Sequence, residues 1–297
     1  MNPQEHILSV CIASYGDDVQ PLLHSLSESK SRGLPDSWSI EIIISDQFQS
    51  THIDAEKWEV EFDCTYIHNP LKIGRSINRN DLGHKAKGDY LLFLDADALP
   101  TNPTFLQDYC QRATLAEVIV GGTAYKPNFK SNKLRVKVGK LKEEHSAAVR
   151  ERYPYGSFSA FNFLIRRDIF LELLFNEDVT EYGHEDTLFG LELKYRNIAI
   201  MHIDNPAYHV GIDENDVFMD KTTAAIDGLA KLIMAGKIDE DIKLFRVYRT
   251  AQRSGIHHVL RLLNSLFGKT LKKALCTGHL PVFFYDVYKF MRLCSHP

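Results

Sequence analysis

Four short apolar runs that end in polar residues constrain the fold of this chain more than any other feature. They cover Ile7–Ala13, Ile40–Asp46, Cys64–His68 and Tyr90–Asp95. Helical patterns at 19–29 and 74–86 separate the first run from the second and the third from the fourth. This order predicts an α/β protein with a right-handed, doubly wound sheet. Ligands of such sheets bind beyond the carboxyl ends of the strands, where these polar residues would gather.

The fourth run leads into two acids, Asp95 and Asp97, with one residue between them. Side chains alternate along a strand, so we expect both carboxylates to point the same way. Two carboxylates aimed at one spot repel unless a cation lies between them. Oxygen ligands suit Mg²⁺ or Mn²⁺, which predicts a divalent ion here. The alternative is a strand that simply ends in a polar turn.

The second half of the chain has a less regular pattern. We expect strands at 118–124, 159–166 and 199–203, and helices at 104–116, 168–175 and 185–196. The polar, basic stretch 126–155 is interpreted as a flexible loop or an acceptor flap. The chain after Gly211 is expected to be helical to its end. We therefore predict a catalytic domain over 1–211 and a helical, basic C-terminal region over 212–297.

The C-terminal region concentrates positive charge. Residues 246–297 carry nine Lys and Arg against one acid, while the whole chain has a net charge of −4. Residues 256–275 have the pattern of an amphipathic, cationic helix, with aromatic residues following at 283–290. This composition is typical of a helix on an anionic membrane surface. The alternative is a helical cap with a solvated basic face. Nucleic acid is not expected as a partner, because no known binding module accompanies the charge.

The cysteine pattern favours a reducing compartment. The five cysteines include no C-x-x-C pair, which indicates free thiols rather than a disulfide framework or a zinc site. The chain begins without a signal-like segment and has no apolar run of about 18 residues. We expect a cytoplasmic protein, with peripheral contact on the inner face of the membrane if residues 246–297 bind lipid.

Several motifs together resemble family 2 nucleotide-sugar glycosyltransferases, which are inverting enzymes with a GT-A-type fold. The resemblance covers roughly residues 6 to 211. It rests on Ala13-Ser14-Tyr15, Ile44-Ser45-Asp46, Gly74 to Asn80 with Ala86-Lys87-Gly88, Phe93 to Asp97, and Gly183-His184-Glu185-Asp186. The Glu-Asp pair, with His209 in Tyr208-His209-Val210-Gly211, is similar to the galactosyl- and N-acetylgalactosaminyl-transferring branch. The family usually has a second acid and a Gly-Ser turn after the position of Asp46, whereas Gln47-Phe48-Gln49-Ser50 stands here.

The resemblance implies a nucleotide site at the strand ends. Asp46 would accept a hydrogen bond from uracil, and Ser14 and Tyr15 would pack on the nucleotide. The alternatives are a capping aspartate and an ordinary turn. Arg79 and Asn80 would lie close to the nucleotide, and Arg79 could instead tie its helix to a carboxylate.

The resemblance also implies a metal and a base. Asp97 would bind the ion, Asp95 would touch the ribose or the water shell of the ion, and His209 would be a third ligand that favours Mn²⁺ over Mg²⁺. The alternative for His209 is a structural histidine. Asp186 would take the proton of the acceptor hydroxyl, and Glu185 would hold the acceptor sugar.

Acids also favour the first turn of a helix, so these two residues have a structural alternative. His184 is a third candidate, and the roles of Glu185 and Asp186 could be exchanged.

The expected activity is transfer of a hexose or N-acetylhexosamine from a UDP-sugar to a hydroxyl of a glycan or lipid-linked glycan, in surface polysaccharide or lipopolysaccharide synthesis. One rival is a non-catalytic scaffold of the same fold that binds sugar nucleotides or glycans. A nucleotidyltransferase is disfavoured because Ser14-Tyr15-Gly16-Asp17-Asp18 lacks a Gly-rich phosphate loop with Lys.

Overall fold

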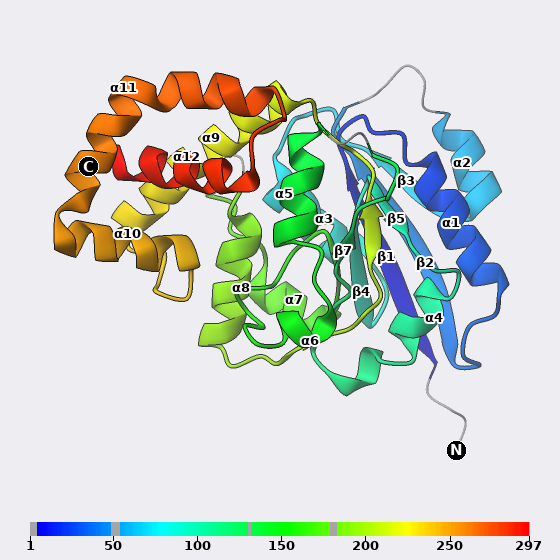
Figure 1. Ribbon diagram of the computed structural model, residues 1–297. Helices are drawn as coiled ribbons and strands as arrows, with labels where there is room; N and C mark the ends of the chain where they lie inside the picture. Colours follow the sequence, from blue (N-terminus) through cyan, green and yellow to red (C-terminus); the bar gives the residue numbers. More distant parts are fainter. Residues whose placement is uncertain (1–4, 49–53, 130–131, 179–182, 297) are drawn as a thin grey trace. The chain divides into compact units, whose positions relative to one another are not determined.

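The structure is a computed structural model that describes residues 5–48, 54–129, 132–178 and 183–296 (Figure 1). Its chain divides into two compact units. Unit 1 comprises residues 1–126, 143–178 and 189–210, and unit 2 comprises residues 127–142, 179–188 and 211–297. The last boundary falls between Val210 and Gly211, and each unit is described by itself below.

A mixed sheet forms the centre of unit 1. Its strands are β1 (His6–Ser14), β2 (Trp38–Asp46), β3 (Cys64–His68), β4 (Tyr90–Asp95), β6 (Val118–Val120), β8 (Asn162–Arg166) and β9 (Ile200–His202). Their spatial order is β3-β2-β1-β4-β8-β6-β9. The first four are parallel, and β8 is antiparallel to both β4 and β6. The predicted α/β class with a mixed, doubly wound sheet is confirmed.

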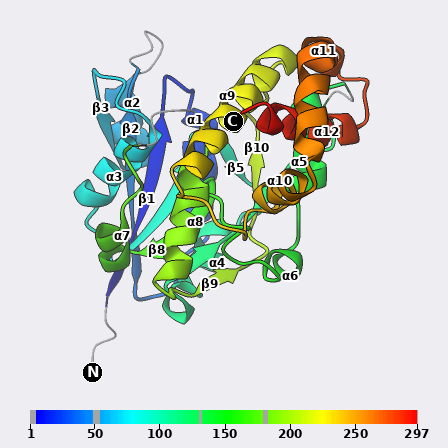
Figure 2. The same cartoon turned by 90° about the vertical axis from the view of Figure 1, so that its left-hand side faces the viewer.

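Helices cover both faces of the sheet (Figures 1 and 2), and alternate residues of the strands enter two apolar layers. Val10 and Ile12 pack with α1 (Gln20–Ser31), α2 (Ala55–Phe62) and α4 (Phe105–Cys110). Cys11 and Phe93 face the other layer, which contains α3 (Arg75–Lys85), α7 (Arg167–Leu173) and residues from Phe189 onward of α8 (Glu185–Tyr195). Burial on both faces explains why these strands are continuous apolar runs.

A second sheet has three strands, the first of which follows β4 in the sequence. Its order is β5-β10-β7, from β5 (Ala98–Pro100), β10 (Ala207–His209) and β7 (Thr123–Ala124). β5 and β10 were not predicted, because strands of three residues leave no periodic pattern in the sequence. The antiparallel pairing of β10 with β5 sets His209 opposite Ala98. It therefore brings His209 next to the end of the Asp95–Asp97 segment.

Three expected elements differ from the structure. Asp97 lies in a turn after β4, so strand alternation does not orient it as predicted. The expected strand 118–124 is split between β6 and β7 at Gly121 and Gly122, where Gly122 has φ +97°. The expected helix 104–116 is α4 followed by a 3-10 turn at Ala113–Leu115. In each case the chain turns within a segment that was predicted as one continuous element.

Unit 2 consists of helices. They are α5 (Leu134–Lys142), α9 (Asn215–Met234), α10 (Lys243–Ser254), α11 (Ile256–Cys276) and α12 (Val282–Cys294), together with the first turn of α8. Leu134 and Val138 of α5 join Phe218, Leu275 and Tyr285 in one apolar core. The segment interpreted as a flexible loop, 126–155, thus contains α5 and also α6 (Ala147–Arg150) in unit 1, while residues 130 and 131 lie outside the described residues.

Two further findings concern single residue types and helix length. All five cysteines are free thiols, as predicted. Among the helices of the described residues, none combines the length and the apolar character needed to cross a bilayer.

Candidate active site

The carboxyl ends of β1, β2 and β4 meet at one edge of the sheet in unit 1. Ser14 pairs with Asp46, and Ala13 pairs with Asp95. The strand order changes direction around β1, so this edge is the switch point at which α/β sheets bind their ligands. The predicted convergence of Ser14, Asp46 and Asp95 is therefore present in the structure.

Asp46 organises the loops at this edge. Its side chain is fully buried; Oδ1 accepts hydrogen bonds from the backbone N–H of Gly16 (2.7 Å) and Phe48 (3.3 Å). Its Oδ2 accepts one from the Tyr66 hydroxyl (2.7 Å). Burial and this bond raise the pKa of Tyr66, so the hydroxyl stays a donor. Asp46 thus fixes the turn at Gly16, whose φ of +72° favours glycine; its contact with uracil stays a prediction.

Two aromatic rings stand exposed beside Asp46. Tyr15 is 49% exposed and Phe48 54%, with ring centroids 5.6 Å apart. The Lys72 amine lies 4.9 Å from the centre of the Tyr15 ring. Ser14 is buried below them, and its hydroxyl accepts the backbone N–H of Asp17 (3.2 Å). Phe48 and Lys72 were not among the predicted residues, although an aromatic residue two positions after the end of β2 was a usable signal.

Gln47 stands where the family usually has a second acid. Its Oε1 accepts the backbone N–H groups of Ile73 (3.0 Å) and Gly74 (3.1 Å), and its Nε2 donates to the Gly74 carbonyl (3.0 Å). Gly74, with φ +89°, precedes α3. The departure from the family pattern therefore has a structural use, because Gln47 fixes the entry into α3. Gln49 and Ser50 lie outside the described residues.

The two predicted residues of α3 are buried and have partners in the protein. Arg79 pairs with Asp95 (Nη2 to Oδ1, 2.6 Å), and its guanidinium lies 5.4 Å from the centre of the Phe175 ring. Of the two interpretations of Arg79, the tie between its helix and a carboxylate is present. Asn80 donates to the Phe175 carbonyl (2.9 Å) and Glu177 (2.9 Å) and accepts the Phe175 N–H (2.8 Å). Nucleotide contact by Arg79 or Asn80 stays a prediction.

Asp97 and His209 lie together at the end of β4. Their Oδ2 and Nδ1 atoms are 3.6 Å apart, and the backbone N–H of Val210 donates to the Asp97 carbonyl (3.0 Å). Burial raises the pKa of Asp97 to about 7, with Asp95 and Asp17 adding to the rise. The surrounding protein groups therefore do not offset the cost of burying the charge of Asp97. A cation bound beside the carboxylate would offset that cost and lower the pKa again.

These donor atoms fit a divalent ion. Two ligands that each bind one ion at roughly 2.1 Å can be up to about 4 Å apart, so the 3.6 Å separation of the Asp97 and His209 atoms is compatible with shared coordination. No group of three or more His, Cys, Asp and Glu side chains in the described ranges is arranged to hold a metal. Asp95, the other predicted ligand, is paired with Arg79. The structure therefore provides an Asp–His pair, and further ligands would come from the substrate or water.

Two aromatic rings pack against the His209 ring. The rings of Tyr125 and Phe161 are stacked with it, at 5.9 Å and 5.3 Å between centroids. The Tyr125 hydroxyl donates to the Glu143 carboxylate (2.5 Å). Stacking with two neighbouring rings restricts the rotation of the imidazole beside Asp97.

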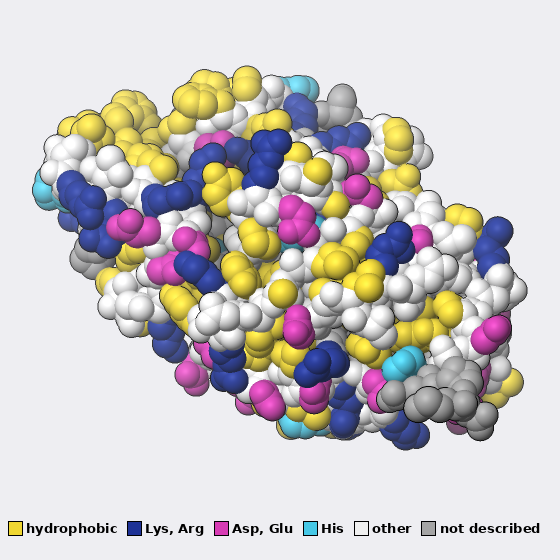
Figure 3. All heavy atoms as spheres, turned by 90° about the horizontal axis from the view of Figure 1, so that it is seen from below, with side chains coloured by type: hydrophobic (Ala, Val, Ile, Leu, Met, Phe, Trp, Pro, Cys, Tyr) yellow, Lys and Arg dark blue, Asp and Glu magenta, His cyan; other side chains and the backbone are white. Residues whose placement is uncertain are grey.

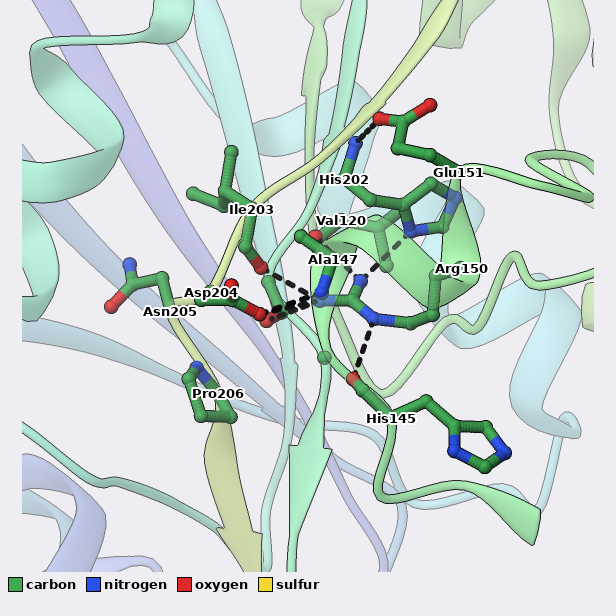
Figure 4. Close-up of polar contacts among 12 residues, drawn as sticks. Val120, His145, Ala147, Arg150, Glu151, His202, Ile203, Asp204, Asn205 and Pro206 are labelled. Atoms are coloured by element: carbon green, nitrogen blue, oxygen red, sulfur yellow. Dashed lines mark hydrogen bonds and ion pairs between the residues drawn. The ribbon is translucent and has the colours of Figure 1, made fainter.

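A buried arginine, Arg150, supports the segment that leads to β10 (Figure 4). Its guanidinium donates to the carbonyls of His145 (3.1 Å), Val120 (2.9 Å), Gly121 (3.1 Å) and Ile203 (2.7 Å). Burial lowers the pKa of Arg150, and these carbonyls offset part of the cost of burying the charge. The role of Arg150 was not predictable from the sequence, because an arginine in such a segment is normally exposed.

We expect Arg150→Met to destabilise the protein by about 2–3 kcal/mol, because several buried carbonyls would lose their donors at once. The free energy of unfolding, measured in urea, checks this. Arg152→Met is the matched control, since Arg152 is exposed two residues away. Equal stability of both variants would contradict the structural role of Arg150.

His202 contacts the buried arginine that supports the segment leading to β10. Its Nδ1 lies 2.8 Å from Arg150 Nη1 and its Nε2 lies 3.0 Å from the Pro154 carbonyl, so the ring accepts at Nδ1 and donates at Nε2. Burial lowers the pKa of His202, and Arg150 adds to the shift. A proton on Nδ1 would face the guanidinium.

We therefore expect a loss of stability in acid. Above the unfolded pKa of 6.5 the imidazole is neutral in both states, and stability falls as the pH drops from there through the lower folded pKa. Urea unfolding at pH 7.5 and 5.5 checks this. His202→Gln should lose less stability over that interval than the unchanged chain; an identical loss would contradict the assignment.

The predicted base lies in unit 2. Gly183 and His184 both have positive φ, +91° and +74°, directly before α8. His184 Nε2 lies 2.9 Å from the Ala225 carbonyl, and burial lowers the pKa of His184. Glu185 is buried, and Asp186 Oδ1 accepts the backbone N–H of Thr187 (2.7 Å). A non-glycine residue held at positive φ marks strain that often occurs at functional sites.

Comparison with known proteins assigns the family. The model of the family described as "Glycosyl transferase family 2" matches residues 9–174, more than half of the chain. The chain belongs to glycosyl transferase family 2. The match includes the sheet edge with Ser14, Asp46, Asp95 and Asp97 of this glycosyltransferase, and ends before Asp186 and His209. A search of curated proteins found no match.

Solved structures share the GT-A-type fold of this glycosyltransferase. A mannosyltransferase from Pyrobaculum calidifontis, in complex with GDP-Man and Mn²⁺, has TM-score 0.59 and 14% identity over 98% of this chain and 86% of that one. TarS 1–349 from S. aureus, in complex with UDP-GlcNAc, has TM-score 0.54 and 17% identity over 97% and 90%. Glucosyl-3-phosphoglycerate synthase from Mycobacterium tuberculosis, with Mn²⁺ and UDP, has TM-score 0.52 and 15% identity over 79% and 82%.

Proposed function

We propose that this glycosyltransferase is metal-dependent and inverting, and that it moves a hexose or N-acetylhexosamine from a UDP-sugar to a hydroxyl of a glycan or lipid-linked glycan. The 3.6 Å approach of Asp97 to His209 at the sheet edge carries the proposal. Solved structures of the same fold contain Mn²⁺ with GDP-Man or with UDP, and one contains UDP-GlcNAc. The family of this chain supports the transfer reaction itself.

Each predicted residue has a role in this proposal. Asp97 and His209 hold Mn²⁺ or Mg²⁺, which when bound neutralises charge on the leaving diphosphate. Asp95 orients the site through Arg79 and lies beside the ribose or the water shell of the ion. Asp186 accepts the proton of the acceptor hydroxyl, and Glu185 holds the acceptor sugar.

In this proposal the base of the nucleotide stacks on the aromatic pair. Tyr15 and Phe48 are exposed rings at the edge that Asp46 organises, and stacking of a base on an aromatic ring is tolerant of base identity. The Lys72 amine adds positive charge beside them. Galactosyl or N-acetylgalactosaminyl transfer and a place in surface polysaccharide or lipopolysaccharide synthesis are the finer form of this proposal. They rest on the motif at 183–186 and on His209.

Release of UDP tests the activity. The protein is incubated with Mn²⁺ and a panel of UDP-sugars, with GDP-mannose as a second nucleotide, and slow release of the nucleotide to water is followed. We expect release from one UDP-sugar above the others, and its loss with EDTA. Binding of a UDP-sugar without any turnover would instead favour a non-catalytic scaffold, and release with EDTA present would contradict the metal.

Phe48→Ala tests the stacking role. We expect the dissociation constant for UDP to rise about 5- to 30-fold, since stacking on one aromatic side chain contributes about 1–2 kcal/mol. Isothermal titration calorimetry with UDP and Mn²⁺ measures it. Phe283→Ala is a matched control, because Phe283 is an exposed phenylalanine of unit 2. Unchanged affinity in Phe48→Ala would move the nucleoside away from this pair.

A further inference from the structure

The outward face of α11 in unit 2 is apolar. Gly268 and Leu275 are buried, which defines the inward side of the helix. At 100° per residue, Val259, Leu262 and Leu266 lie on the opposite side. They are 57%, 59% and 62% exposed. Three large aliphatic side chains on one exposed stripe are unusual for a surface helix, whose outward face is normally polar.

More apolar surface adjoins this stripe. Ile256 and Phe267 are 54% and 56% exposed on the same helix, and Phe283 at the start of α12 is 67% exposed. Figure 3 shows hydrophobic side chains gathered at the upper left, over the C-terminal helices. Two other aromatic residues that follow α11 differ from the prediction, because Tyr285 and Tyr288 belong to the core of unit 2, whereas Phe284 is 38% exposed. The stripe of α11 is thus the main exposed apolar feature of the predicted amphipathic segment.

The charge on α11 is positive throughout. Lys269 and Lys273 follow Leu262 and Leu266 by seven residues, so they continue the same face over the last turns of the helix. The helix contains no acid, and Arg261 is also cationic, although its guanidinium donates to the carbonyls of Cys294 and His296 within the unit. Lys272 belongs to the unit itself, since it pairs with Asp220. The outward face therefore changes along its length from aliphatic to cationic.

We propose that α11 lies flat on an anionic lipid bilayer, with Val259, Leu262 and Leu266 in the boundary between headgroups and acyl chains, and with Lys269 and Lys273 at the headgroups. An exposed apolar stripe with cationic residues and no acids has the chemistry of an interfacial helix. Contact between two copies through this face is less favourable, because like charges would meet. A solvated basic cap, the alternative from the sequence, does not explain the aliphatic stripe.

Vesicle sedimentation with the full chain tests the proposal. The vesicles contain phosphatidylcholine alone or with 30% phosphatidylglycerol, roughly a bacterial-type negative surface charge. We expect the protein to sediment with the anionic vesicles and to be released by salt. Leu262→Gln/Leu266→Gln should weaken binding at least about tenfold, since two inserted side chains are lost. Lys269→Gln/Lys273→Gln should weaken it by about fivefold per lysine.

Matched variants separate this face from general surface effects. Leu115→Gln/Leu141→Gln changes two other exposed leucines, and Lys57→Gln/Lys85→Gln changes two other exposed lysines. Both should bind as the unchanged chain does. Absence of sedimentation with anionic vesicles would overturn the proposal. Dimerisation in the absence of lipid that Leu262→Gln/Leu266→Gln abolishes would also overturn it, and would assign the face to a second copy. The outcome does not depend on the activity of the enzyme.

Discussion

Asp97→Asn should lower the rate of UDP release about a thousandfold and abolish Mn²⁺-dependent binding of UDP. The amide keeps the shape of the side chain but loses the charge that would hold the ion beside His209. Metal-ion stabilisation of a leaving phosphate contributes several kcal/mol, and each 1.36 kcal/mol is tenfold in rate. Release of UDP and calorimetric titration of UDP with and without Mn²⁺ measure the two effects.

The same variant should be at least as stable as the unchanged chain when no metal is present. Burial and the neighbouring carboxylates raise the pKa of Asp97 to about 7, so its ionised form destabilises the fold as the pH rises from the unfolded value of 3.8 through 7. Removing the charge removes that cost. Mn²⁺ with UDP should raise the melting temperature of the unchanged chain but not of Asp97→Asn.

Asp36→Asn serves as the control for this experiment, because Asp36 is an exposed aspartate of unit 1. It should match the unchanged chain in rate, affinity and melting temperature. Asp97→Asn with normal Mn²⁺-dependent affinity would contradict the metal assignment. A large loss of melting temperature in metal-free Asp97→Asn would instead assign the carboxylate a structural role.

The long strands were predictable because burial on both faces gives each of them a continuous apolar run. β1, β2 and β4 follow the expected bounds within two residues, and their ends place Ser14 beside Asp46 as topology requires. Elements of three residues, such as β5 and β10, carry no period. Their pairing is set by tertiary contacts, and it is this pairing that places His209 beside Asp97.

In the site, too, the positions of the strand ends were predictable from the sequence, whereas the contacts that fix the side chains were not. Residue order placed Asp46 and Asp95 at the correct edge, but it could not show that Asp46 is enclosed by Gly16, Phe48 and Tyr66. Strand alternation does not orient Asp97 as predicted, since that residue lies in a turn. The predicted location of Asp97 is nevertheless correct, because the turn brings its carboxylate back toward Asp95.

The resemblance of motifs to the family indicated a functional segment that neither hydrophobic periodicity nor sheet topology indicates. The Gly183–Asp186 segment has no strong periodic signal, and the structure adds two successive residues with positive φ directly before α8. Such strain at His184 persists only where surrounding contacts hold it, here the Ala225 carbonyl. Local geometry thus agrees with a functional use of this helix start, although acids also favour helix starts for electrostatic reasons alone.

Asp186→Asn separates these two explanations of the helix start. The amide oxygen can still accept the backbone N–H of Thr187, so the first turn of α8 should stay intact. If Asp186 is the base, release of UDP should fall about 10²- to 10⁴-fold while the affinity for UDP is unchanged. If the acid serves only the helix dipole, stability should fall by less than about 1 kcal/mol and the rate should be nearly normal.

Glu185→Gln is the matched variant, because it removes the adjacent charge in the same turn. If Glu185 holds the acceptor sugar, Glu185→Gln should have a higher KM for the acceptor and a smaller change in kcat. The measurement uses an acceptor found among the glycans tested. A large fall in rate in Glu185→Gln with a normal rate in Asp186→Asn would exchange the two roles.

His184→Gln gives the third comparison. Burial lowers the pKa of His184, and its Nε2 faces the Ala225 carbonyl. We therefore expect this variant to lose stability and to keep the pH profile of the rate. A changed acidic limb of that profile would transfer the base to the imidazole.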